Sequence, residues 1–111
     1  MDIETRTHPK IHVNWPTVIE TRQGSIAGKT SDISVAGVFI LSSAEPEIDQ
    51  RISILLEPPG ERSIRVIGKM VWSDNFDLDD KTVFGMAIRF IAISPEDQQH
   101  IATLVEEGRS E

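Results

Sequence analysis

Apolar and polar side chains alternate in several short segments of the chain, which is the pattern of β-strands with one buried face. In the first segment, Ile11, Val13 and Trp15 alternate with polar residues. Pro16 then interrupts the alternation, as a proline does at a bulge or a sheet edge. Because apolar residues resume beyond the proline, we expect the first strand to continue through Ile19.

The next two predicted strands follow closely. A turn at Gly24 separates the first strand from residues 25–32, where Ile26 and Thr30 lie on one face. This arrangement is typical of a β-hairpin, in which the second strand returns beside the first. A third strand is predicted for the apolar run at residues 38–41.

Three later segments, at residues 51–57, 64–72 and 86–90, also alternate. Their apolar positions, which we expect to face inward, are Ile52, Ile54 and Leu56; Ile64, Val66, Met70 and Trp72; and Met86, Ile88 and Phe90. Prolines and a glycine end the first of these segments, and we interpret the acidic residues 73–81 as a solvated loop. About six short strands at this spacing predict an antiparallel barrel or sandwich.

The end of the chain predicts a helix that packs on this sheet. Ser94 suits the N-cap position, Pro95 the first helical position, and acidic residues follow in the first turn. Ile101 and Val105 are then one helical turn apart and form an apolar stripe. Gly108 is predicted to be the C-cap.

Length and composition predict one domain. The chain has 111 residues, of which 39% are hydrophobic and 26% are charged, the balance of a globular protein. A chain of this length has room for one core. We therefore expect one folded unit over residues 11–108, preceded by a mobile polar leader at residues 1–10.

Cysteine is absent, so the sequence predicts no disulfide, no thiolate metal site and no cysteine nucleophile. The first residues lack the basic and then apolar layout of a signal peptide. The longest apolar stretch, residues 35–41, is too short to cross a bilayer. We therefore expect a cytoplasmic protein without membrane insertion.

The net charge of −7 bears on the choice of partner. Binding to DNA draws on many lysine and arginine contacts to phosphate, so a long polyanion is an unfavourable partner for this surface. A small anion needs only two or three well-placed cations. The sequence therefore predicts no DNA binding and leaves a small phosphate-bearing ligand open.

Two short stretches carry candidate binding residues. Asp32, Ser34 and Gly37 lie between two predicted strands, and alone they would suit a turn in which the polar side chains cap backbone N–H groups and Gly37 takes a positive φ angle. The second stretch lies in the leader, where Arg6 and Lys10 are four residues apart. Alone it would equally suit a solvated terminus.

Together these stretches resemble the PilZ domain family, whose members carry Arg-x-x-x-Arg before the first strand and Asp/Asn-x-Ser-x-x-Gly after the second. Asp32, Ser34 and Gly37 match the second motif fully, whereas the first motif has Arg6 in its leading position and Lys10 in place of its trailing arginine. The resemblance covers nearly the whole chain. It implies a six-stranded antiparallel β-barrel with a C-terminal helix, in a bacterial receptor for the second messenger cyclic di-GMP.

The resemblance also implies a role for each motif residue. Arg6 would place its planar fork on guanine or phosphate, and Lys10 would reach the ligand as a point charge. Asp32 would accept hydrogen bonds from guanine, with Ser34 beside it, and Gly37 would let the ligand approach the backbone closely. The leader would fold over the nucleotide and change the surface offered to an effector protein.

The alternative is a PilZ-like protein-interaction module that has lost nucleotide binding because Lys10 replaces the second arginine.

Other chemistry lacks support in the sequence. The acidic segment 73–81 does not have the glycine and glutamate spacing of an EF-hand, and His8, His12 and His100 are scattered without a zinc motif. Ser34 lacks the glycine pattern of a nucleophile elbow. We therefore expect a binding domain without catalytic residues, metal or cofactor.

Overall fold

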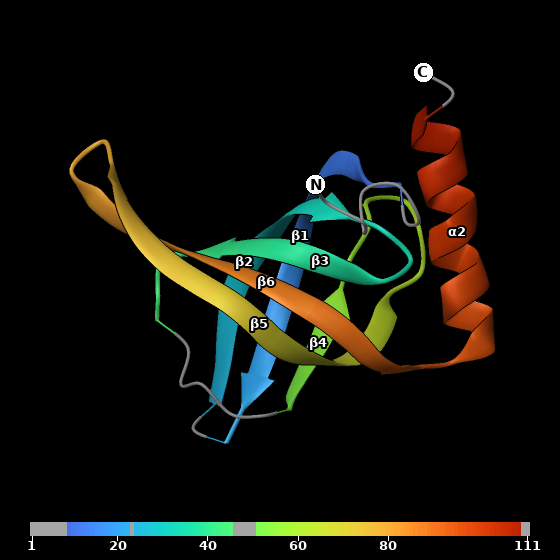
Figure 1. The fold of residues 1–111 in the computed structure, drawn as a ribbon, viewed down its shortest axis with the longest axis horizontal. Helices are drawn as coiled ribbons and strands as arrows, with labels where there is room; N and C mark the ends of the chain where they lie inside the picture. The colour runs from blue at the N-terminus through green and yellow to red at the C-terminus, as the bar shows by residue number, and fades with distance from the viewer. Residues whose placement is uncertain (1–8, 23, 46–50, 110–111) are drawn as a thin grey trace.

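The computed structural model describes residues 9–22, 24–45 and 51–109. In these ranges six antiparallel strands close into a barrel-like ring in the order β1-β2-β3-β6-β5-β4, with one helix beside it (Figure 1). The elements are β1 (Ile11–Thr21), β2 (Gly24–Ile33), β3 (Gly37–Ser42), β4 (Ile52–Leu56), β5 (Ile64–Leu78), β6 (Lys81–Ile93) and α2 (Pro95–Arg109). The predicted fold class, an antiparallel barrel with a C-terminal helix, is confirmed.

The barrel interior is built from the alternating apolar positions. Ile19, Ile54 and Ile64 are fully buried, and each such side chain stabilises the fold by about 1.5–3 kcal/mol relative to an exposed one. Two of the buried hydroxyls lie against each other: Thr17 donates to the Trp15 carbonyl at 3.1 Å, and its oxygen lies 2.7 Å from that of Thr30. Since the Thr17 proton is used on the carbonyl, Thr30 donates to Thr17, and both buried polar groups are satisfied.

Helix α2 begins as predicted, with the Ser94 Oγ accepting a hydrogen bond from the Asp97 N–H at 3.1 Å. Ile101 is fully buried against the barrel. The predicted C-cap is wrong, because the helix continues through Gly108 to residue 109. A Cβ at Gly108 would lie 2.7 Å from Ile11 Cδ1, so this glycine allows the end of the helix to pack closely on β1. No helix in the described ranges is long and apolar enough to cross a membrane.

The segment predicted as an acidic loop is instead a β-hairpin, so that prediction is wrong. β5 continues to Leu78 and pairs there with Lys81 at the start of β6. The two residues between them, Asp79 and Asp80, have φ angles of 52° and 63°. Positive φ at both central residues is the geometry of a type I′ turn, whose twist matches the flanking strands, and aspartate tolerates it better than most residues.

The hairpin projects from one end of the barrel (Figure 1). Where the hairpin leaves the barrel, the pairing register of β5 and β6 shifts, and the predicted inward direction of Trp72 is wrong. Met70 pairs with Ile88 and Trp72 with Ala87, so Val71 is an extra residue in β5 and forms a β-bulge. Trp72 is therefore turned outward and is 49% exposed, although the alternation predicted that it would face inward.

Candidate functional site

Asp32 lies on the outer face of the barrel near the end of β2. Its neighbour Ile33 points into the core and is 1% exposed, whereas Asp32 is opposite His12 of β1 and Phe39 of β3. The Asp32 Oδ1 contacts the His12 Nδ1, and the Oδ2 accepts a hydrogen bond from the Ser31 hydroxyl at 3.2 Å. Oδ1 is shielded from solvent and receives no well-directed hydrogen bond from the described residues. The acceptor capacity of this oxygen is thus unused by the described residues, while the oxygen itself is closed to solvent.

Ser34 shapes the loop that follows β2. Its Oγ accepts hydrogen bonds from the N–H groups of Ala36 at 3.1 Å and Gly37 at 3.3 Å. The Ser34 N–H in turn donates to the Gly37 carbonyl at 2.9 Å. The turn function suggested by the sequence is thus confirmed for Ser34. Both side-chain bonds use the oxygen as acceptor, so within the described contacts the hydroxyl proton remains available for donation.

Gly37 is required by the packing of β3 against β6. Among the described residues, glycines with positive φ are Gly24 and Gly60, so the positive φ expected at Gly37 is wrong. A Cβ at Gly37 would instead lie 2.4 Å from the Ile88 carbonyl oxygen. Glycine is therefore needed because β3 and β6 approach each other too closely here for any side chain.

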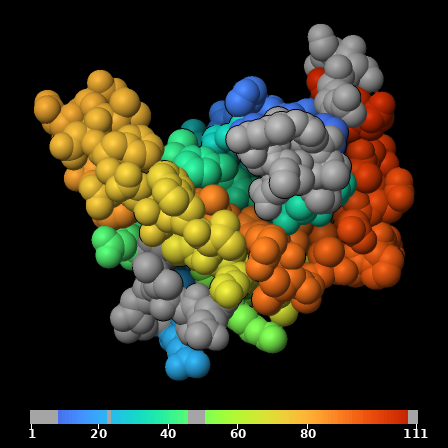
Figure 2. Space-filling view, in the orientation of Figure 1, coloured from blue at the N-terminus to red at the C-terminus, as the bar shows by residue number. Residues whose placement is uncertain are grey.

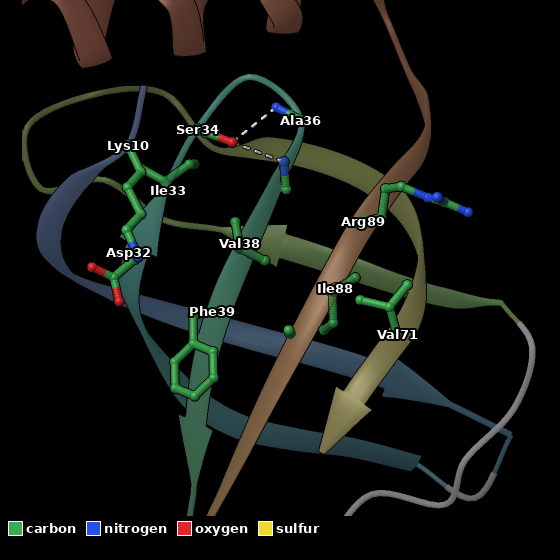
Figure 3. A pocket seen from close by; sticks show the side chains of 12 residues that line it. Lys10, Asp32, Ile33, Ser34, Ala36, Val38, Phe39, Val71, Ile88 and Arg89 are labelled. Carbon is green, nitrogen blue, oxygen red and sulfur yellow. Dashed lines mark hydrogen bonds between the residues drawn. The ribbon is translucent and has the colours of Figure 1, made fainter. Parts of the chain in front are cut away.

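These residues surround a shallow pocket on the outside of the barrel (Figure 3). Its lining residues are Lys10, Asp32, Ile33, Ser34, Ala36, Gly37, Val38, Phe39, Val71, Ala87, Ile88 and Arg89. The structure thus brings together Lys10, Asp32, Ser34 and Gly37 at one pocket. The remaining predicted site residue, Arg6, lies outside the described residues.

Arg89 lines the pocket and was missed by the sequence reasoning. It is opposite Gly37 in the β3–β6 pair, on the side of the pocket remote from Lys10, and its side chain extends away from the pocket (Figure 3). The alternation of buried Met86 and Ile88 shows that Arg89 must face outward, but only the pairing of β3 with β6 places it beside Gly37. That pairing joins segments about fifty residues apart and leaves no local pattern.

The pocket is suited to an anionic ligand that also carries hydrogen-bond donors. Lys10 supplies positive charge at one side, and Arg89 lies at the rim with its guanidinium directed away from the pocket (Figure 3). After a change of side-chain rotamer, the Arg89 fork would fit phosphate oxygens or the O6 and N7 atoms of guanine. Asp32 offers carboxylate oxygens to N–H donors. Within the described ranges no three His, Asp or Glu side chains gather in a cluster that could hold a metal ion.

Solved structures share this fold at low sequence identity. MotI/DgrA, the Bacillus subtilis inhibitor of motility, is 16% identical with a TM-score of 0.79, and the match covers 97% of this chain and 52% of that one. The PilZ domain of Escherichia coli YcgR, solved with c-di-GMP, is 14% identical with a TM-score of 0.77, covering 93% and 90%.

A third structure is MrkH of K. pneumonia, described as a c-di-GMP-dependent transcription regulatory factor. It is 13% identical with a TM-score of 0.80, and the match covers 94% of this chain and 51% of that one. The chain thus spans about half the length of MotI/DgrA and MrkH. No curated protein matches the chain by sequence. The PilZ domain family model matches residues 4–107, and the chain therefore belongs to the PilZ domain family.

Proposed function

We propose that this domain is a receptor for cyclic di-GMP that regulates a partner protein by changing the surface it presents when the nucleotide binds. The observation that carries the proposal is the pocket itself, whose lining includes the cations Lys10 and Arg89 and the motif residues Asp32, Ser34 and Gly37. The family relationship adds support, because the PilZ domain of YcgR was solved with this nucleotide.

Asp32 is the residue we assign to reading the guanine base. A guanine presents an N–H and an amino group side by side on one edge, and a carboxylate can accept from both. The contacts of Asp32 with Ser31 and His12 hold the carboxylate in position before the ligand arrives. The Ser34 hydroxyl is free to donate to the ligand because its oxygen already anchors the loop.

The cations are assigned to the phosphates and to the second edge of guanine. Lys10 directly precedes β1 and lines the pocket, so residues before it are close enough in sequence to reach the same ligand. Arg6 is the residue of this leader that we assign to a bidentate contact. Arg89, fixed on a strand, provides a contact that does not depend on the leader.

Calorimetric titration with cyclic di-GMP tests the proposal, with GMP as the control ligand. We expect saturable binding of the cyclic dinucleotide and much weaker binding of GMP, because one mononucleotide cannot use the cations on both sides of the pocket. A flat titration with folded protein would reject the receptor. The chain would then be a protein-interaction module, the reading that the lysine at position 10 favours.

The expectation that DNA is not a partner remains a prediction. It rests on the net charge of −7. The related MrkH is described as a transcription regulatory factor, and this chain spans about half of that protein. A titration with duplex DNA at low and at physiological salt checks the expectation directly, since electrostatic binding to DNA is strongest at low salt.

A further inference from the structure

The outer face of the β5–β6 hairpin carries exposed apolar side chains. Trp72 is 49% exposed, Phe76 41% and Leu78 56%, and all three alternate along one face of β5. The hairpin extends away from the body of the molecule (Figure 2). Large apolar side chains that gather on an exposed surface indicate a contact site for another molecule.

The same strand has a free edge. β4 pairs with β5 from Ile64 to Gly68, and beyond Gly68 the only described strand beside β5 is β6. None of the described residues pairs with the opposite edge of β5 from Lys69 to Leu78, so within this part of the chain its backbone N–H and C=O groups are unpaired. Such an edge is a template for an added strand, which natural proteins normally protect.

Acidic residues protect this edge against a second copy of the chain. Asp74 lies on the apolar face between Trp72 and Phe76, and Asp77, Asp79 and Asp80 lie at the end of the hairpin. Two copies paired along this edge would bring these carboxylates together, in a protein whose net charge is already −7. A segment carrying lysine or arginine would instead be attracted, so charge complementarity selects a basic partner.

We propose that the free edge of β5 binds an extended, basic segment of a partner protein as an added antiparallel strand. Apolar side chains of that segment pack against Trp72 and Phe76, and its cationic side chains lie beside Asp74 and Asp77. The inference deepens the proposed function by naming the surface and the chemistry of the partner. It rests on that function only for its dependence on nucleotide.

The nucleotide pocket and the free edge are in contact through Phe39. Phe39 lines the pocket and also packs on Trp72, with ring centroids 5.8 Å apart and an interplanar angle of 31°. In the sheet, Asp32, Phe39, Ala87 and Trp72 form one row across four neighbouring strands. A ligand that moves the Phe39 ring therefore changes the position of Trp72 at the docking edge.

A synthetic strand peptide tests the docking edge without knowledge of the natural partner. In a capped eight-residue probe, valines oppose Trp72, Phe76 and Leu78, lysines oppose Asp74 and Asp77, and threonines fill the other positions. We expect binding to the full chain, with amide shifts and slowed hydrogen exchange along residues 69–78. Replacing the lysines with glutamates should weaken binding at least about tenfold, because like charges then face each other.

Two controls separate strand addition from general attraction between opposite charges. A probe with N-methyl groups on the amides that face β5 keeps its charge but cannot pair, and it should not bind. The double variant Trp72→Thr and Phe76→Thr keeps every acid and the strand propensity, and it should lose the interaction. If this variant unfolds, Asp74→Asn with Asp77→Asn replaces it, and this pair should lose the preference for the lysine probe.

Equal binding of the lysine, glutamate and N-methylated probes, or shifts located away from β5, would overturn the proposal. Self-association of the chain that Trp72→Thr abolishes, measured by analytical ultracentrifugation, would assign the edge to a second copy and overturn it too. A final titration adds cyclic di-GMP. If the probe binds and cyclic di-GMP does not, the docking edge is supported and the receptor function is rejected. If cyclic di-GMP binds and the probe shows no strand-specific binding, the receptor function is supported and the docking edge is rejected.

Discussion

His12 and Asp32 face each other across the β1–β2 pair, with the imidazole Nδ1 against the carboxylate Oδ1. The side chain of Asp32 is 20% exposed, and Ser31 holds its other oxygen. The carboxylate that we assign to guanine is thus oriented by its own sheet. An acceptor fixed in advance loses little conformational freedom when the ligand binds.

Asp32→Ala should weaken nucleotide binding by about 1–3 kcal/mol, because the guanine donors would lose their acceptor. Since the side chain lies outside the core, the midpoint of thermal unfolding should change little. Asp32→Asn keeps one acceptor oxygen, so its affinity for the nucleotide should lie between those of the parent and of Asp32→Ala. Calorimetric titration measures the affinities, and equal values for all three proteins would make Asp32 a turn residue only.

Gly37→Ala should destabilise the fold by about 1–3 kcal/mol, because its Cβ would collide with the Ile88 carbonyl and push β3 away from β6. The matched control is Ala36→Gly in the same loop, which introduces no collision. Urea unfolding followed by tryptophan fluorescence compares the two. A Gly37→Ala protein as stable as the parent would show that the strands separate without cost.

Lys10→Arg should tighten nucleotide binding at least about fivefold if a bidentate contact worth roughly 1–3 kcal/mol is gained. Lys10→Ala should weaken binding and reduce its dependence on salt, because one cation facing phosphate is lost. Arg6→Ala should cost more than Lys10→Ala, since we assign the directional contact to the arginine. No change in any of the three affinities would mean that the leader does not touch the ligand.

Arg89→Ala should weaken binding of the nucleotide, and Arg89→Lys should restore only part of the affinity because lysine keeps the charge without the fork. Lys81→Ala removes the same charge from the hairpin, away from the lining residues of the pocket, and serves as the control. If both alanine variants bind with the same affinity, Arg89 acts only through the overall charge of the protein.

Glu20 should titrate below the ordinary range of a glutamate, because hydrogen bonds from Arg65 and Ser53 lower its pKa. A lowered pKa in the folded state adds stability above the pKa of the unfolded state, and this contribution is lost as the pH falls through the folded value. Arg65→Met should move the pKa of Glu20 back towards its ordinary value. Carboxyl NMR titration of both proteins measures the change.

The strands could be predicted because the interior follows strict alternation, as Ile52, Ile54 and Leu56 show on β4, whereas the choice of a barrel over a sandwich came from the resemblance to the PilZ family. The alternation of apolar and polar residues fails to predict the structure where the backbone departs from a regular strand. The extra residue at Val71 turns Trp72 outward, and the two left-handed aspartates make a hairpin from a segment whose composition indicates a loop. The bulge leaves no local pattern of apolar residues, and in the hairpin the alternation of Trp72, Phe76 and Leu78 is interrupted by Asp74.

The candidate site was predictable where its residues are close in sequence. Asp32, Ser34 and Gly37 belong to one turn, and the structure places them at one pocket with Lys10. Arg89 could not be found in this way, because it joins the site through the pairing of β3 with β6. The positive φ predicted for Gly37 was wrong, and its packing role could not be foreseen because the close approach of β6 exists only in the folded barrel.

The bulge at Val71 also lies at the base of the projecting hairpin, where a small rotation moves the tip farther than the base. From this residue to Leu78 the strand is about 23 Å long at roughly 3.3 Å per residue, compared with 36 Å for the longest dimension of the molecule. A rotation of about 10° at the bulge would move the tip by about 4 Å, while the barrel beneath stays unchanged. Because Val71 also lines the pocket, a small displacement there would produce a larger one at the tip of the hairpin.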